Sequence, residues 1–397
     1  MRSILLKILR KAIRLIEKKQ PNEVVKEDAI LQNVFNTNFQ KKVLISYLKK
    51  PFLEGIKYHH TNYLECYTAA EAFHELGFGV DVIDLMEENT LVPYADYSVV
   101  YGLGFALENA FHSEYAEHIK KIFYSTGYNP FYAYRVSLLQ VENFYGRNKK
   151  LIPQSSRVQS LFWANQYLLS DLVIALGNNA VANSYLETNK NINVHSISAF
   201  YFDVYDIDLN KKNFANASKN FLWFGSSGLL HKGLDLIIDI FANRNDISLH
   251  ICGADKNERK FLDFYNPIIE KCDNIFEHGF IPLQSSKFNE LMNLCAYTIF
   301  PSASEGGSPA LLNVMANGGL IPIATKTCGV DIKELGFEIE ELSEKGILKQ
   351  IEEVILLSTD IIKEKSENVK TIVKSIYTYD SYKTQLSRLI KEELSSN

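Results

Sequence analysis

Apolar and polar positions alternate in two separate series along the chain, and both series predict strands joined by amphipathic helices. The first series lies between residues 42 and 197. Its short apolar runs predict strands at 42–46, 80–84, 97–101, 121–125, 171–175 and 194–197, with helices at 61–76, where Thr61 is a candidate N-cap, and at 131–145. This alternation is typical of parallel α/β units, in which helices cover a parallel sheet.

The second series follows a polar stretch, residues 203–219, which shows little apolar periodicity and is interpreted as an interdomain linker. Strands are predicted at 221–224, 247–252, 274–276, 297–300 and 320–324, and helices at 233–242, 257–265, 285–295 and 309–317. The helix over 257–265 is expected to stop before Pro267, because proline breaks helices. From residue 342 onward the pattern is almost entirely helical.

The length of the chain supports the same division, since 397 residues exceed what one hydrophobic core usually holds. We therefore predict an α/β protein with two Rossmann-like domains. The predicted segments are a basic helix with its linker at 1–28, an N-terminal domain at 29–202, a linker at 203–219, a C-terminal domain at 220–375, and a last helix at 376–397 that is a candidate to cross back to the N-terminal domain.

Residues 1–19 contain seven basic residues and one acidic residue, so this segment carries +6 and the rest of the chain −11, for a net charge of −5. At helical spacing, Lys7, Lys11, Arg14 and Lys18 share one face, opposite Leu5, Ile8, Leu9, Ala12 and Ile16. Such a helix suits an anionic membrane surface. The alternative is a helix whose apolar stripe docks on the protein body. The pattern slightly favours the membrane.

The overall composition is that of a globular protein, with 46% hydrophobic and 22% charged residues. The acidic balance argues against nucleic acid as a partner. No apolar run is long enough to span a bilayer, and the N-terminus lacks the features of a secretory signal. Five cysteines without a Cys-x-x-Cys pair favour a reduced, cytoplasmic protein and argue against structural zinc: Cys66, Cys252, Cys272, Cys295 and Cys328.

Two loops that follow predicted strands carry candidate chemistry. The first runs from Gly225 to Gly233 and combines small residues with Lys232, a combination suited to a diphosphate, although an ordinary turn with an exposed lysine fits equally well. The second, residues 301–313, places Glu305 on a glycine-rich turn ahead of a helix, with Ser308 as the expected N-cap and Pro309 at the first helical position. A carboxylate there can accept hydrogen bonds from sugar hydroxyls, and the helix amides can bind phosphate.

The span from 220 to 335 resembles the C-terminal domain of the retaining family 4 (group 1) glycosyltransferases. The resemblance is carried by Pro301-Ser302, Glu305-Gly306, the stretch 315–319, the stretch 321–325, and the Lys232-Gly233 pair seven residues after Gly225. It implies the GT-B fold, in which two Rossmann-like domains with parallel sheets face each other across a cleft. The N-terminal half resembles the family only in its alternation and in the form of Glu54-Gly55 with the following helix.

The resemblance also implies site roles. Glu305 would hold the hydroxyls of the donor sugar, and Lys232 would bind the diphosphate. The donor-binding set is completed by Gly225, Ser226, Gly279, Phe280, Ile281, Gly306, Gly307, Ser308, Pro309, Ala310 and Asn313, of which Gly279 to Ile281 match the segment that meets the nucleotide base. Asn313 and Ser226 stand where the family has glutamate and often arginine, so either Lys232 faces the diphosphate with less help or the other domain contributes a residue.

Candidates in the N-terminal domain are Gly55, His60, Tyr128 and Asn129. His59 and His60 follow the first strand and suit phosphate or acceptor binding, but a solvent-exposed pair is slightly favoured. Aromatic side chains such as Tyr128 can stack on sugar rings, although burial in a core is their more common fate. Asp206-Ile207-Asp208 matches a metal-binding motif of a different glycosyltransferase fold and is rejected as a site, because it lies in the polar linker.

These features predict a glycosyltransferase that moves a sugar from a nucleotide-diphosphate-sugar to a saccharide or lipid-linked saccharide acceptor, with retention and without a metal or other cofactor. Surface polysaccharide assembly at the inner membrane face follows from the family and the basic helix. The main alternative is an inactive scaffold subunit, which Asn313 and Ser226 support. A dinucleotide enzyme is disfavoured, because no Gly-x-Gly-x-x-Gly follows the first strand.

Overall fold

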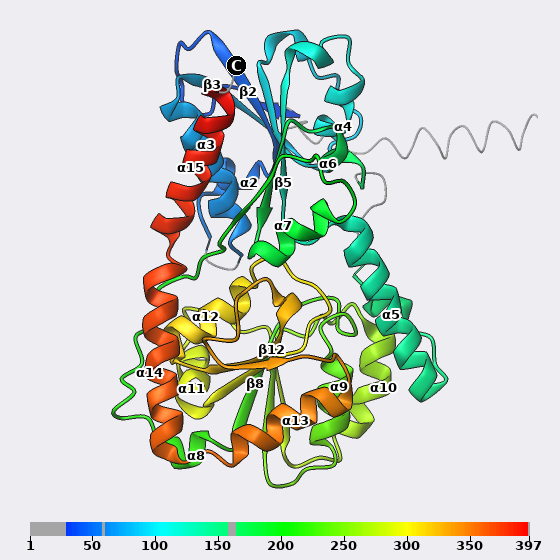
Figure 1. Cartoon of the computed structure of the whole chain (residues 1–397), viewed down its shortest axis with the longest axis vertical. Helices are drawn as coiled ribbons and strands as arrows, with labels where there is room; N and C mark the ends of the chain where they lie inside the picture. The colour runs from blue at the N-terminus through cyan, green and yellow to red at the C-terminus, as the bar shows by residue number, and fades with distance from the viewer. Residues whose placement is uncertain (1–28, 58–59, 158–163, 396–397) are drawn as a thin grey trace, which may run out of the picture.

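The computed structural model describes residues 29–57, 60–157 and 164–395. It shows two α/β domains, one above the other in Figure 1, each built on a parallel sheet flanked by helices. The predicted fold class is confirmed. The predicted basic helix within residues 1–28 lies outside the described residues.

The N-terminal domain holds a seven-stranded sheet of order β1-β3-β2-β4-β5-β6-β7, parallel except for the pairing of β1 with β3. Alternate residues of β2 enter different hydrophobic clusters, with Val43 and Ile45 in one and Leu44 in the other, so both faces of the sheet are buried. The strands are β1 Ile30–Leu31, β2 Lys41–Tyr47, β3 Phe78–Asp84, β4 Val99–Gly102, β5 Lys120–Ser125, β6 Leu172–Leu176 and β7 Val194–Ile197. The helices are α2 Lys50–Glu54, α3 Asn62–Glu75, α4 Phe105–His112, α5 Pro130–Asn148, α6 Gln166–Leu169 and α7 Asn179–Leu186, with 3-10 turns at Tyr94–Asp96, Ala116–His118 and Pro153–Ser155.

The C-terminal domain holds a six-stranded, wholly parallel sheet of order β10-β9-β8-β11-β12-β13. Its strands are β8 Asn220–Phe224, β9 Ser248–Cys252, β10 Ile275–Gly279, β11 Tyr297–Phe300, β12 Ile321–Thr325 and β13 Phe337–Ile339. Its helices are α8 Phe214–Ala217, α9 Leu234–Phe241, α10 Arg259–Ile269, α11 Ser286–Leu294, α12 Pro309–Gly318, α13 Glu344–Ile355 and α14 Thr359–Ile376, with a 3-10 turn at Lys326–Cys328.

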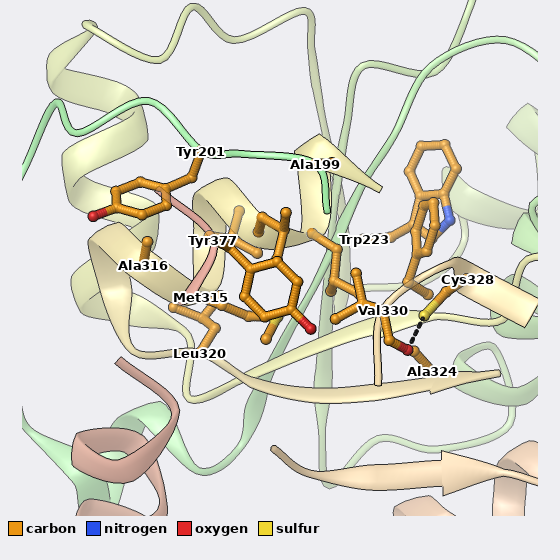
Figure 2. Packing of buried hydrophobic residues seen from close by; sticks show 14 of the residues in the cluster. Ala199, Tyr201, Trp223, Met315, Ala316, Leu320, Ala324, Cys328, Val330 and Tyr377 are labelled. Carbon is orange, nitrogen blue, oxygen red and sulfur yellow. Dashed lines mark hydrogen bonds between the residues drawn. The ribbon is translucent and has the colours of Figure 1, made fainter. Parts of the chain in front are cut away.

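One hydrophobic cluster continues from the first domain into the second. Figure 2 shows the part of it where the segment after β7 and the connection between α14 and α15 enter the C-terminal core: Ala199, Tyr201 and Tyr377 lie near Met315, Ala316, Leu320 and Val330. The backbone amide of Tyr201 donates to the carbonyl of Tyr377 at 3.3 Å. The two segments that connect the domains therefore pack together as part of the core.

The last helix, α15 (Tyr379–Ser395), lies along the N-terminal domain, where it contacts α3 and β7 (Figure 1). The hydroxyls of Tyr382 and Tyr124 lie 3.1 Å apart, and Lys120 Nζ lies 2.8 Å from Glu393 Oε1. Buried apolar side chains of α15 anchor the contact: Leu386, Leu389 and Ile390. The C-terminal end of the chain thus returns to the first domain.

A second crossing lies on the other side of the molecule, where α5 leaves the N-terminal domain and runs down beside α9 and α10 (Figure 1). The Phe144 and Phe264 rings pack edge to face with centroids 5.3 Å apart. Arg147 forms an ion pair with the buried Asp235 of α9. We call residues 130–157 the α5 arm; after α5, this segment stays against the C-terminal domain as far as Arg157, the last described residue before 164.

The predictions for the end of α10 and for the start of α3 are wrong. Helix α10 continues through Pro267 to Ile269. Because proline has no backbone N–H, the carbonyl of Asp263 loses its helical hydrogen bond. Pro267 and Asp263 are both exposed, so water can solvate that carbonyl. Thr61 makes no side-chain cap; its hydroxyl instead donates to Glu65 Oε1 at 2.6 Å.

Candidate active site

A cavity of about 410 Å³ lies between the domains, at the carboxyl ends of strands from both sheets. Tyr47 ends β2 on one side, and Phe224 and Phe300 end β8 and β11 on the other. Parallel α/β sheets bind ligands at this edge. The position of the cavity therefore makes it the candidate active site.

Glu305 lies on the β11–α12 loop with 9% of its surface exposed, and both carboxylate oxygens face cations. Its Oε1 lies 2.6 Å from Lys232 Nζ and accepts from Ser302 Oγ at 3.1 Å, while its Oε2 lies 2.6 Å from Arg157 Nη1. Burial on its own raises the pKa of Glu305, but the charges of Arg157 and Lys232 outweigh it and lower the pKa below its usual value. Glu305 is therefore ionised at neutral pH.

Lys232 reaches Glu305 from the β8–α9 loop, and its pKa is lowered by burial, against the opposing attraction of Glu305. Two backbone amides of this loop already have a partner within the protein. The amides of Gly228 and Leu229 donate to the Glu258 carboxylate, the second at 3.1 Å. The loop instead supplies the Lys232 ammonium, together with Gly225 and Ser226 on the cavity wall.

His231, next to Lys232, fixes the position of the Glu305 loop. Its Nε2 lies 2.7 Å from the carbonyl oxygen of Ser304, and burial lowers its pKa to about 4. The ring is therefore neutral at physiological pH, and Nε2 donates its proton to that carbonyl. The backbone amide of Ala303 also donates to the His231 carbonyl, at 2.8 Å.

Ser308 precedes α12, but the expected side-chain N-cap is wrong. Its φ is +39°, and its hydroxyl donates to the carbonyl of Cys328 at 2.5 Å instead of to a helix amide. The adjoining glycines permit close approach to the N-terminal domain: a Cβ on Gly306 would lie 2.0 Å from the carbonyl oxygen of Thr126, and one on Gly307 would lie 2.4 Å from Cβ of Ala199. The paired glycines thus bring Glu305 against the opposite domain.

Asn313 lines the cavity, yet its Oδ1 already accepts a hydrogen bond from the Phe202 amide at 2.8 Å. One turn later, Asn317 Oδ1 accepts from the amides of Val204 and Tyr205 at 3.0 and 2.7 Å. Both asparagines therefore hold the interdomain segment against α12. Unlike the glutamate carboxylate of the family, the Asn313 amide also carries donor hydrogens.

Most predicted donor residues and one from the N-terminal domain meet at this cavity: Gly225, Ser226, Lys232, Phe280, Ile281, Glu305, Gly306, Ser308, Pro309, Ala310, Asn313 and His60. Five others are not among its lining residues: Gly55, Tyr128, Asn129, Gly279 and Gly307. Asn129 is buried and caps α5, its Oδ1 accepting from the Phe131 amide at 3.0 Å, and the buried Tyr128 stacks on Tyr132. Gly55 is exposed at the end of α2, and His59 lies outside the described residues.

Sequence reasoning missed two charged residues of the cavity, Arg157 and Glu65. Glu65 is buried in the first turn of α3, where Tyr47 donates to its Oε2 at 3.0 Å. Its position after the first strand was a usable signal, because the start of the following helix must lie at the ligand-binding edge. Arg157 had no such signal, since neither a strand end nor a motif adjoins it.

Within the described residues, no group of three or more His, Cys, Asp or Glu side chains is arranged to hold a metal ion. The rejected motif is accounted for by ion pairs: Asp206 pairs with Lys370 and Lys374, and Asp208 with Lys211. The cysteines are free thiols. Among the helices of the described residues, none has the length and apolar character of a membrane span.

Comparison with solved structures shows which fold this is. Sucrose-phosphate synthase from Thermosynechococcus elongatus matches with a TM-score of 0.64 and 13% identity, covering 90% of this chain and 100% of that one. Anabaena HepE in complex with UDP and glucose matches with a TM-score of 0.58 and 14% identity over the same shares. The fold is therefore GT-B, the two-domain architecture of many glycosyltransferases.

The sequence matches a protein-family model as well. Residues 206–371 match the model described as glycosyl transferases group 1, which covers β8 to β13 and the loops that carry Lys232 and Glu305. No curated protein sequence matches the chain. The family match and the GT-B fold identify the protein as a glycosyltransferase.

Proposed function

We propose that the protein transfers a sugar from a nucleotide-diphosphate-sugar to a saccharide or lipid-linked saccharide acceptor, with retention and without a metal cofactor. The observation that carries the proposal is an ionised carboxylate, Glu305, held beside Lys232 in a cavity between two nucleotide-type folds. UDP is present in the structures of HepE and of Staphylococcus aureus TarM, whose match has a TM-score of 0.52 at 14% identity, which supports a nucleotide donor here.

The chemistry requires stabilisation of the negative charge that develops on the diphosphate as the sugar bond breaks. Lys232 supplies a buried positive charge, which is worth more in a water-excluded site than in bulk water. The start of α12 adds the positive end of its dipole. Glu305 accepts hydrogen bonds from donor-sugar hydroxyls, which replace part of its ion-pair network on binding.

The acceptor enters from the N-terminal side of the cavity, where His60, Asn62 and Glu65 lie. Glu65 already accepts from two hydroxyls, those of Tyr47 and Thr61, so its orientation is fixed. Retention requires the acceptor hydroxyl on the face of the anomeric carbon that the diphosphate leaves. The cavity can bring both partners together because both domains contribute to its lining.

We infer that the protein is cytoplasmic and acts in surface polysaccharide assembly, bound peripherally to the inner membrane face through residues 1–19. The second candidate, an inactive scaffold subunit, is favoured by one observation. The side-chain oxygen of Asn313 already accepts a hydrogen bond from the Phe202 amide, as it would in a purely structural residue. The charged pair Glu305 and Lys232 favours turnover, because a scaffold gains nothing from burying it.

A donor screen tests the transfer reaction. Purified protein is incubated with a panel of nucleotide sugars, and binding and slow donor hydrolysis are measured for wild type, Glu305→Gln and Lys232→Ala. We expect one donor to be bound and hydrolysed, and both variants to lose about 100-fold or more in rate, because each removes charge from the reacting centre.

Glu142→Gln is the matched control, since Glu142 is exposed on α5 and outside the cavity lining. Circular dichroism melts of all variants separate lost chemistry from lost folding. Hydrolysis that survives unchanged in Glu305→Gln and Lys232→Ala would contradict the site. Absence of binding and turnover with every donor, also when saccharide acceptors are added, would favour the scaffold.

A further inference from the structure

Arg157 reaches the C-terminal site although it belongs to a segment that starts in the N-terminal domain. The segment is anchored just before it: the Ser155 carbonyl accepts from the amides of Leu230 and His231 at 3.1 and 3.3 Å. The amide of Arg157 itself donates to Ser137 Oγ of α5 at 2.6 Å. Arg157 is therefore held by α5 on one side and by the Lys232 loop on the other.

Arg157 changes the net charge of the site. Lys232 and Glu305 cancel each other, so this buried pair alone offers no net charge to a diphosphate. Arg157 adds the cation that makes the three-residue group positive. His231 does not help at neutral pH, because burial lowers its pKa to about 4. The other two residues of the β8–α9 loop that line the cavity, Gly225 and Ser226, are uncharged.

The guanidinium also has the exposure that a ligand-binding cation needs. Its side chain is 43% exposed and lines the cavity, whereas that of Lys232 is 6% exposed. Its planar group can bind two phosphate oxygens at once, which an ammonium cannot do. If donor hydroxyls bind the Glu305 carboxylate in place of Arg157, the guanidinium becomes available to the phosphates.

We propose that Arg157, carried across the cleft by the α5 arm, is the second cation of the donor diphosphate site. The assignment rests on the proposed transfer reaction, and it assigns donor affinity to a segment outside the C-terminal fold. It also makes the docking of α5 on α9 and α10 a condition for donor binding, because the docked arm keeps Arg157 beside Glu305.

The test is isothermal titration of UDP, GDP, ADP and dTDP into the full-length wild type, Arg157→Ala, Arg157→Lys and Lys232→Ala, together with the matching nucleoside monophosphates. For the diphosphate that binds wild type, Arg157→Ala should weaken affinity about 10- to 100-fold, the worth of a charge-assisted hydrogen bond. Arg157→Lys should recover part of the loss. Arg157→Ala should lower the affinity for the monophosphate less, because the monophosphate lacks the second phosphate.

Arg388→Gln is the control, because Arg388 is exposed on α15 and forms a local ion pair with Glu392. The side chain of Arg157 is partly exposed and its anchoring hydrogen bond uses the backbone amide, so its variants should fold. Wild-type affinity in Arg157→Ala, with loss in Lys232→Ala, would overturn this assignment and leave the transfer reaction standing. Tighter binding in Arg157→Ala would show that Arg157 blocks the site, and would also overturn it. Failure of wild type to bind any diphosphate would overturn both proposals.

Discussion

At Gly306, next to Glu305, the two domains lie too close together to leave room for a side chain. A Cβ there would lie 2.0 Å from the carbonyl oxygen of Thr126, and backbone cannot yield as a flexible side chain can. We expect Gly306→Ala to shift the Glu305 loop or widen the cleft, with a loss of about 100-fold in kcat/KM, since a displacement of about 1 Å can cost this much. Steady-state kinetics with the identified donor measures the effect.

The matched control is Gly146→Ala, because Gly146 lies within α5 and a Cβ there meets nothing within 4 Å. It should be neutral or more stable by about 0.5 to 1 kcal/mol, since alanine favours helix more than glycine does. Wild-type kinetics in Gly306→Ala would show that the loop can move without affecting the site.

The donor-side residues could be predicted because their signals are local. Glu305 and Lys232 each lie in the loop that follows an apolar strand, so the sequence itself marks their position at the sheet edge. Arg157 is 148 residues from Glu305 along the chain, and their contact depends on where α5 docks. Ser308 shows the opposite failure: its residue type fits an N-cap, but the Cys328 carbonyl competes for its hydroxyl.

At the scale of elements, β9 carries a buried histidine, His250, that contacts the half-buried His278 of β10, and charge on either ring should oppose folding. His250 Nδ1 lies 3.0 Å from His278 Nε2, and its other ring nitrogen lies 3.0 Å from Asn220 Oδ1. Burial lowers the pKa of His250 to about 4, and burial also lowers that of His278, with Lys287 adding to the effect. Both rings are therefore uncharged in the folded protein at neutral pH.

This arrangement predicts a pH dependence of stability. Below pH 6.5 His250 becomes protonated in the unfolded chain, but in the folded protein it stays neutral down to about pH 4. The contribution of this residue to the free energy of unfolding therefore falls as the pH decreases through that window. Between pH 7 and 5 the loss should be about 2 kcal/mol. Urea unfolding of wild type and His250→Gln at both pH values measures it, and the difference between the two proteins isolates the histidine from other titrating groups. Equal pH slopes would contradict the prediction.

Which elements could be predicted follows from their burial. The central strands of both sheets are apolar on both faces and stand out as continuous runs, which is why β2, β8 and β11 were located. The edge strands β1 and β13 have two and three residues, too few for any periodicity to show. Helices α4 and α7, of eight residues each, were also missed.

At the scale of the whole molecule, the cleft is held on two sides. Helices α14 and α15 pass from one domain to the other on the left of Figure 1, and the α5 arm does so on the right. The contacts involved join residues far apart in sequence, such as Tyr124 with Tyr382 and Arg147 with Asp235. Periodicity indicates which of these segments are helical but carries no information about which helix or strand each one contacts, so these interdomain contacts could not be predicted from the sequence.

Charge at the molecular scale bears on where the enzyme works. The first 19 residues carry +6 and the remainder −11, so an anionic surface should attract one end of the chain and repel the rest. We expect the full chain to sediment with phosphatidylglycerol vesicles at low salt and to be released by high salt. Deletion of residues 1–19 should abolish sedimentation, because the body that remains is acidic.

A second variant tests whether membrane binding depends on the charge of residues 1–19 or only on their presence. Replacing Lys7, Lys11, Arg14 and Lys18 with glutamine keeps the apolar face, and at about 1 kcal/mol for each basic residue it should lower binding more than 100-fold. If the truncated protein still sediments, another surface binds the membrane. If neither form sediments but truncation lowers Tm, the segment docks on the protein body, and the charge segregation serves the fold instead of the membrane.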